Sequence, residues 1–128
     1  MSIRIVRLGS PRADDEGLRI GTVRRPPRGI KKADFAAKNF YDVWYPVLAP
    51  SEALLKSHFP IASDDDWRRF KRRFLQEMKV PHAIKTLDLL AAFSHRSNFS
   101  VGCYCVDEEH CHRSLLRELF IARDALIG

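Results

Sequence analysis

The residues best suited to chemistry in this sequence lie within one short segment, 103–113, which reads CYCVDEEHCHR. It holds all three cysteines of the chain and two of its five histidines. Thiolates and imidazoles serve as nucleophiles, general bases and metal ligands. The apolar run 99–105 predicts a strand, and the residues after Cys111 predict an amphipathic helix. We therefore expect a strand–loop–helix unit, with its reactive groups at the carboxyl end of the strand, where parallel sheets bind ligands.

A helix that starts near Cys111 favours anions at that point. Its first backbone N–H groups lack partners within the helix, and the positive end of the helix dipole attracts phosphate, sulfate or carboxylate. Arg113, in the first turn, adds a planar pair of donors suited to such oxygens. The same position predicts a lowered pKa for the Cys111 thiol.

Four interpretations of the cysteines and histidines stay open at this point. Cys111 or Cys103 can be a catalytic nucleophile assisted by His112 or His110. A metal site can form from Cys103, Cys105, His110, Cys111 and His112, although the paired C-x2-C spacing of structural zinc sites is absent. A redox pair of Cys103 and Cys105 is disfavoured, because residues two apart on a strand lie about 7 Å from each other. The last interpretation is simple packing of small buried residues.

Positive charge is concentrated in the first third of the chain. Residues 1–40 carry ten Lys and Arg against four Asp and Glu, whereas residues 41–128 carry twelve of each. The net charge of +6 therefore belongs to residues 1–40. Arg24, Arg25 and Arg28 follow the second predicted strand, and in a parallel sheet they would approach Arg113. This arrangement predicts an anion site for a phosphate-bearing ligand, nucleotide or nucleic acid.

The remaining elements predict a three-layer α/β fold, with a mainly parallel sheet flanked by helices. We expect one domain over 1–128. Strands are predicted at 2–8, 18–24 and 99–105, an extended edge segment at 41–47, and helices at 31–39, 51–58, 64–78, 81–97 and 111–127. In the second half of the chain, the apolar residues expected to face inward are Trp67, Phe70, Phe74, Met78, Leu115, Leu116, Leu119, Phe120 and Leu126.

Two further expectations concern surroundings. Trp44 and Tyr45, beside Pro46, either line a pocket or cover a sheet edge. The sequence has no secretory signal and no apolar run long enough to cross a membrane, so we expect a cytoplasmic protein without membrane association. The pattern names no cofactor and no oligomeric state.

The sequence resembles the bacterial YeaO-like family, known as domain of unknown function 488. The resemblance lies in RRPPRGIKK at 24–32, PSEALLKSHF at 50–59 and CYCVDEEHCHRSLL at 103–116. Members typically carry a V-x-R…P-R segment after the second strand, and many carry a Cys eight residues before a Cys-His-Arg that opens the last helix. The matching positions here are Arg24, Pro27, Arg28, Cys103, Cys111, His112 and Arg113.

At one position the sequence departs from this family pattern. Many members have an acidic residue two positions after the first cysteine, and Cys105 stands there in this chain. The resemblance implies a fold and a site but no reaction. We therefore expect an anion-binding site at the Cys-His-Arg motif, with Cys111 and His112 as candidate catalytic groups; the alternative is a non-catalytic interaction module or a zinc or iron site.

Overall fold

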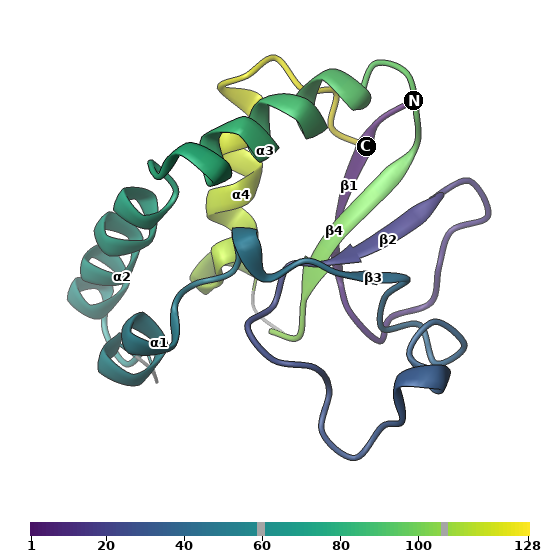
Figure 1. The fold of residues 1–128 in the computed structure, drawn as a ribbon. Helices are drawn as coiled ribbons and strands as arrows, with labels where there is room; N and C mark the ends of the chain where they lie inside the picture. The colour runs from purple at the N-terminus through teal and green to yellow at the C-terminus, as the bar shows by residue number, and fades with distance from the viewer. Residues whose placement is uncertain (59–60, 106–107) are drawn as a thin grey trace.

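The computed structural model describes residues 1–58, 61–105 and 108–128. Its sheet has four strands, all parallel, in the order β1-β4-β2-β3 (Figure 1). The strands are β1 (Ile3–Arg7), β2 (Leu18–Gly21), β3 (Val43–Trp44) and β4 (Phe99–Cys103). Strand β4 lies between β1 and β2, and all five of its residues are buried. That burial on both faces explains why its sequence is a nearly unbroken apolar and small-residue run.

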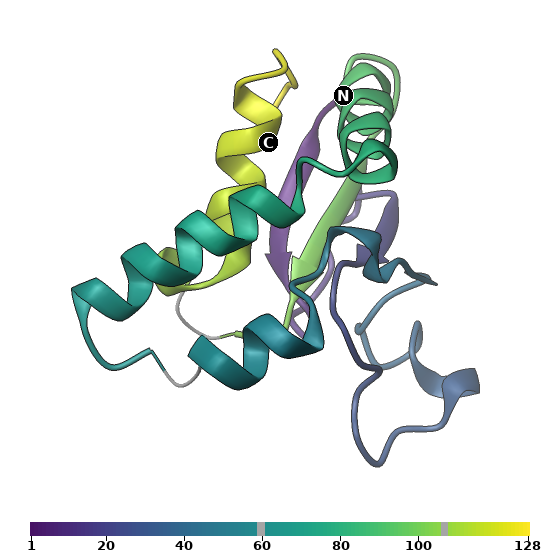
Figure 2. The same cartoon turned by 60° about the vertical axis from the view of Figure 1, so that its left-hand side comes forward.

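Four helices supply the main hydrophobic core. They are α1 (Glu52–His58), α2 (Asp64–Glu77), α3 (Pro81–Phe93) and α4 (His112–Ile121), shown in Figures 1 and 2. Alternate strand residues pack against them: Ile3, Ile20, Phe99 and Val101 belong to the same core cluster as the buried helix side chains. The three-layer α/β prediction is confirmed: the sheet lies between this helical layer and a second, mainly non-helical layer.

Helix α2 forms where its sequence pattern predicts. The Oγ of Ser63 accepts a hydrogen bond from the Asp66 N–H at 3.1 Å, which caps the helix. Phe70 and Phe74 are fully buried, so the predicted apolar stripe faces the core. Trp67 lies at the margin of that core, where its ring stacks on Phe70.

Loops cover the second face of the sheet. Gly21 makes room for one of these loops, because a Cβ there would lie 2.3 Å from the Tyr41 ring. The helix predicted at 31–39 is reduced to the 3-10 helix η1 (Lys32–Asp34), followed by turns. Asn39 ends these turns with a φ of +64°, a conformation that no helix continues through.

A buried ion pair ties these loops to the sheet. Arg19, on β2, is fully buried and donates from Nε and Nη2 to the Glu16 carboxylate at 2.7 and 2.9 Å. Its Nη1 donates to the carbonyls of Ser10 and Asn39 at 2.9 and 2.7 Å. Glu16 also accepts a hydrogen bond from the Ser100 hydroxyl of β4 at 2.6 Å. The Arg19–Glu16 pair therefore joins two loops to the neighbouring strands β2 and β4.

Several predicted boundaries differ from the structure. Strand β2 ends at Gly21 rather than at residue 24, and β4 ends at Cys103 rather than at residue 105. The last helix ends at Ile121 rather than at residue 127, because the chain turns back at Asp124, whose φ is +58°. Leu126, expected inward, is therefore 46% exposed. Within the described residues, no helix is long and apolar enough to span a membrane.

The Glu16–Arg19 pair predicts an acid-sensitive fold. Burial alone would raise the pKa of Glu16. Hydrogen bonds from Arg19 and Ser100 have a larger, opposite effect, so the pKa falls from 4.5 to about 2. A carboxylate with a lowered pKa stabilises the fold above its unfolded pKa, and this contribution is lost as pH falls from 4.5 toward 2. We expect the loss to be about 3 kcal/mol in urea unfolding measured across that range.

The variant Glu16→Gln should lack this acid-dependent component. It should also be less stable at pH 7 by about 3 kcal/mol or more, because it leaves a buried guanidinium without its counter-charge. Asp14→Asn is a matched control, since Asp14 is exposed. A Glu16→Gln variant whose stability fell as steeply with acid as the wild type would contradict this assignment.

Candidate functional site

Thr22 joins the three elements that form the site. It follows β2, and both its backbone N–H and its hydroxyl donate to the Gly102 carbonyl of β4, at 3.0 and 2.9 Å. Its own carbonyl accepts a hydrogen bond from Nε2 of His112, the first residue of α4, at 2.7 Å. The ends of β2 and β4 are thereby held against the start of α4.

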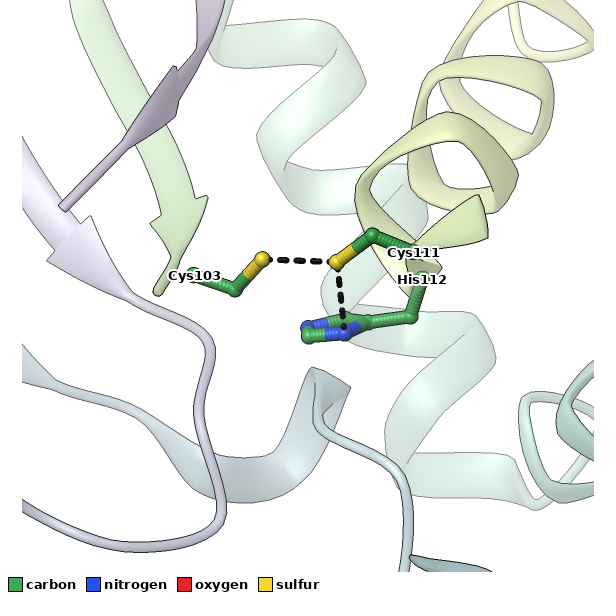
Figure 3. A group of neighbouring side chains, drawn as sticks. All are labelled: Cys103, Cys111 and His112. Atoms are coloured by element: carbon green, nitrogen blue, oxygen red, sulfur yellow. Dashed lines mark hydrogen bonds between the residues drawn. The ribbon is translucent and has the colours of Figure 1, made fainter. Parts of the chain in front are cut away.

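This contact determines the tautomer of His112. A carbonyl oxygen only accepts hydrogen bonds, so Nε2 carries the proton and Nδ1 has a lone pair. That lone pair lies 3.7 Å from the sulfur of Cys111, as Figure 3 shows. Burial lowers the pKa of His112 to about 4, so the ring is neutral at pH 7. His112 can therefore accept a hydrogen bond from the Cys111 thiol.

Cys103 and Cys111 face each other across the gap between sheet and helix (Figure 3). Cys103 ends β4, Cys111 directly precedes α4, and their sulfurs are 2.8 Å apart. Both side chains are buried, and neither is in a disulfide. The donor atoms of Cys103, Cys111 and His112 lie within 4.8 Å of one another, which also makes them a candidate metal-binding group.

The sulfur spacing bears on the metal alternative. Two thiolates on a tetrahedral zinc ion, with Zn–S bonds of about 2.3 Å, lie about 3.8 Å apart. The observed 2.8 Å is about 1 Å shorter. His110, one of the candidate ligands, packs its ring against Trp67 at 5.5 Å, and His112 takes its place beside the sulfurs. These three donors could hold a metal ion if the two sulfurs moved apart by about 1 Å.

The third cysteine, Cys105, differs from the other two in the direction of its pKa shift. Donation from the thiols of Cys103 and then Cys111, together with the nearby positive charge of Arg113, lowers the pKa of Cys105 despite partial burial. The pKa of Cys103 rises, because of its hydrogen bonds with Cys105 and Cys111 and its burial. A hydrogen bond with Cys103 lowers the pKa of Cys111, but the Cys105 sulfur and burial raise it more. The lowered pKa predicted for Cys111 is therefore wrong, and the thiol whose pKa is lowered is that of Cys105.

A cavity of about 600 Å³ opens beside these sulfurs, beyond the carboxyl ends of β2 and β4. Cys103, Cys105 and His112 line it on one side, and the arginine segment that follows β2 lines it on another. Apolar side chains provide the remaining wall: Val23, Pro26, Pro27, Phe40, Leu55 and Tyr104. Cys111 is not among the lining residues, so Cys105 is the cysteine with both a lowered pKa and access to the cavity.

The three arginines after β2 have different roles. Arg24 donates to the carbonyls of Pro46, Ala49 and Pro50 at 2.9 to 3.3 Å, so its guanidinium holds the chain that leads into α1. Arg25 is exposed and forms an ion pair with Glu52 at 2.9 Å. Arg28 is exposed, and among the described residues it makes no hydrogen bond or ion pair. All three line the cavity.

Arg113 lies beneath the site and does not line the cavity. It is 4% exposed, and its Nη2 donates to the Cys105 carbonyl at 2.6 Å. Within the described part of the chain, its Nε has no hydrogen-bond partner. Its positive charge therefore lies close to Cys105, on the side of the loop that faces away from the cavity.

Trp44 and Tyr45 lie away from this cavity. Trp44 is 44% exposed, donates from its indole N–H to the Val23 carbonyl at 2.8 Å, and lines a separate cavity of about 350 Å³. The Tyr45 hydroxyl is 2.9 Å from that of Thr86. Neither of the two residues contributes to the cysteine site.

Sequence reasoning undervalued Cys105 and missed the apolar wall. An unbroken strand over 99–105 would place Cys105 about 7 Å from Cys103. Because β4 ends at Cys103, the chain turns and brings the two thiols together. The signal was present in the departure from the family pattern, since a thiolate there replaces a carboxylate. Phe40 and Leu55, by contrast, come from segments with no pattern that points to a pocket.

Comparisons with known proteins identify a family but no characterised relative. A family model described as "DUF488-N3a: Active DUF488-N3 subclade" matches residues 3–124. No curated protein matches the chain, and no solved structure does.

The site predicts selective thiol alkylation. Iodoacetamide should modify Cys105 first in the folded protein, because it is a half-exposed thiolate, while Cys103 and Cys111 are 1% and 0% exposed. Peptide mass mapping after timed quenching measures the three rates, and the profile should be the same with and without chelator. In guanidinium the three cysteines should react alike. Faster modification of Cys111 in the folded protein would overturn the assignment.

Proposed function

The chain belongs to the DUF488-N3a family, and from that premise we propose that its cavity binds a phosphate-bearing ligand, a nucleotide free or within a nucleic acid, and acts on it through a cysteine thiolate. The observation that carries the proposal is the cavity of about 600 Å³ that Arg25, Arg28, Cys105 and His112 share. Cations and a nucleophile therefore face the same space.

Charge and shape both suit such a ligand. Arg28 offers a guanidinium without an internal partner among the described residues, and phosphate oxygens match its paired donors. The cavity adjoins the first residue of α4, where the helix dipole favours negative charge. The proline and aromatic wall suits a flat organic group, and cavities of about 300–1,000 Å³ accommodate ligands of about nucleotide size.

The chemistry would begin at Cys105. Its thiolate lies at the cavity wall, whereas Cys111 and His112 form a buried thiol–imidazole pair behind it. A thiolate at that wall is placed to attack an electrophilic atom of the bound ligand. Neutral His112, with its Nε2–H held by Thr22, can accept a hydrogen bond from Cys111 and so orient that thiol. This assigns Cys105 as the nucleophile and His112 as a positioning residue.

Ligand binding tests the proposal. We expect a mononucleotide to bind and the corresponding nucleoside to bind at least about tenfold more weakly, because the nucleoside lacks the phosphate. Arg28→Gln should weaken mononucleotide binding about tenfold, and higher salt should weaken wild-type binding. Isothermal titration calorimetry at two salt concentrations measures each quantity.

The matched control is Lys38→Gln. It removes the same charge from another exposed residue of the basic first third, but Lys38 does not line the cavity. Lys38→Gln should bind as the wild type does. Equal losses in the two variants would indicate diffuse attraction to polyanions, and equal binding of nucleoside and nucleotide would refute a phosphate site.

A further inference from the structure

The three cysteines form a connected cluster whose members differ in access and charge. Cys105 is the member that is half-exposed at the cavity. Cys103 and Cys111 are buried, with their sulfurs 2.8 Å apart. Two non-bonded sulfurs normally keep a van der Waals separation, and a disulfide bond needs about 2.05 Å. The buried pair is thus already closer to bonding distance than two unrelated thiols would be.

We propose that Cys105 is a hydroperoxide-oxidisable thiol, and that the buried pair Cys103 and Cys111 resolves the oxidised form and ends as a disulfide. This activity goes beyond ligand binding, and it needs no ligand in the cavity. It assigns a different task to each cysteine: Cys105 meets the oxidant, Cys111 attacks first, and Cys103 completes the disulfide.

In the first step, the Cys105 thiolate attacks one oxygen of a hydroperoxide. The O–O bond breaks, an S–O bond forms, and the alkoxide or hydroxide that leaves takes a proton from water, which gives the sulfenic acid of Cys105. An accessible thiolate is required for this step, and the cavity gives a small hydroperoxide a route to it. Neither buried cysteine has this access, because Cys103 is 1% exposed and Cys111 is 0% exposed.

In the second step, the Cys111 sulfur attacks the Cys105 sulfur. The Cys111 proton passes to the sulfenic hydroxyl, which leaves as water. A Cys105–Cys111 disulfide results. Nδ1 of His112, 3.7 Å from the Cys111 sulfur, accepts a hydrogen bond from this thiol and so orients it, because the other ring nitrogen is held by the Thr22 carbonyl.

In the third step, the Cys103 sulfur attacks Cys111, which lies 2.8 Å from it in the reduced protein. The Cys105–Cys111 bond breaks and Cys105 leaves as a thiolate, while the Cys103 proton passes to solvent. Thiols of low pKa leave fastest in such exchanges, and Cys105 is the one with the lowered pKa. Overall, two thiols and one hydroperoxide give one disulfide, one alcohol or water, and one water.

Stoichiometric oxidation tests this sequence. Reduced protein, with chelator and without ligand, is treated with one equivalent of hydrogen peroxide at pH 7. Thiol titration in guanidinium should then show one remaining thiol of three, and non-reducing peptide mapping should join Cys103 to Cys111. Dithiothreitol should restore all three thiols. An end product in which Cys105 is disulfide-bonded, or oxidation without any disulfide, would overturn the proposal.

Three variants separate the steps. Cys105→Ser should lower the peroxide reaction rate at least about tenfold. Cys103→Ser should stop at a Cys105–Cys111 disulfide. Cys111→Ser should stop at the sulfenic acid of Cys105, which dimedone traps for mass mapping. Wild-type oxidation rates in Cys105→Ser would refute the assigned role of Cys105, and so would dimedone labelling of Cys103 or Cys111 instead of Cys105 in the unsubstituted protein.

Discussion

The buried guanidinium of Arg19 is the constraint on which the rest of the structure depends. The sheet has four strands within the described residues, and loops rather than helices cover its second face. Arg19 compensates by binding Glu16 and two loop carbonyls at once, while Glu16 reaches the Ser100 hydroxyl on β4. A buried charge without this partner would be costly, so the loops must adopt the arrangement that satisfies it. That requirement gives a small domain one defined loop layer.

Internal partners also account for most of the arginine side chains in the basic first third of the chain. Its net charge suggested a general attraction to polyanions, yet the side chains have individual partners. Arg4, Arg12 and Arg25 form ion pairs with Asp15, Asp42 and Glu52, and Arg24 holds three carbonyls. Arg28 lines the cavity and has no such partner among the described residues. Among these arginines, Arg28 is therefore the one whose charge is left for a ligand of the cavity.

The sequence could predict the features that depend on neighbouring residues, and it could not predict those that depend on contacts between distant segments. Periodicity and capping are local, and they identified α2, α3 and the buried strand β4 correctly. The parallel pairing of β2 with β4 could also be inferred, because helices separate the strands, and it placed the arginine segment beside the cysteines. The residues at which β2 and β4 end could not be inferred from the sequence, because Thr22 and the turn after Cys103 depend on contacts between distant segments. Those ends decide which sulfurs meet and which one faces the cavity.

The three thiols illustrate why a motif alone does not identify its reactive member. The position at the start of α4 favours a thiolate at Cys111, but burial in a low-dielectric interior opposes any charge there. When three sulfurs share hydrogen bonds, one negative charge is stabilised by its two neighbours and disfavours a second. The pKa is therefore lowered at Cys105, which retains solvent contact and lies near Arg113. The pKa values of Cys111 and Cys103 are raised, and this division places an accessible sulfur next to two buried thiols.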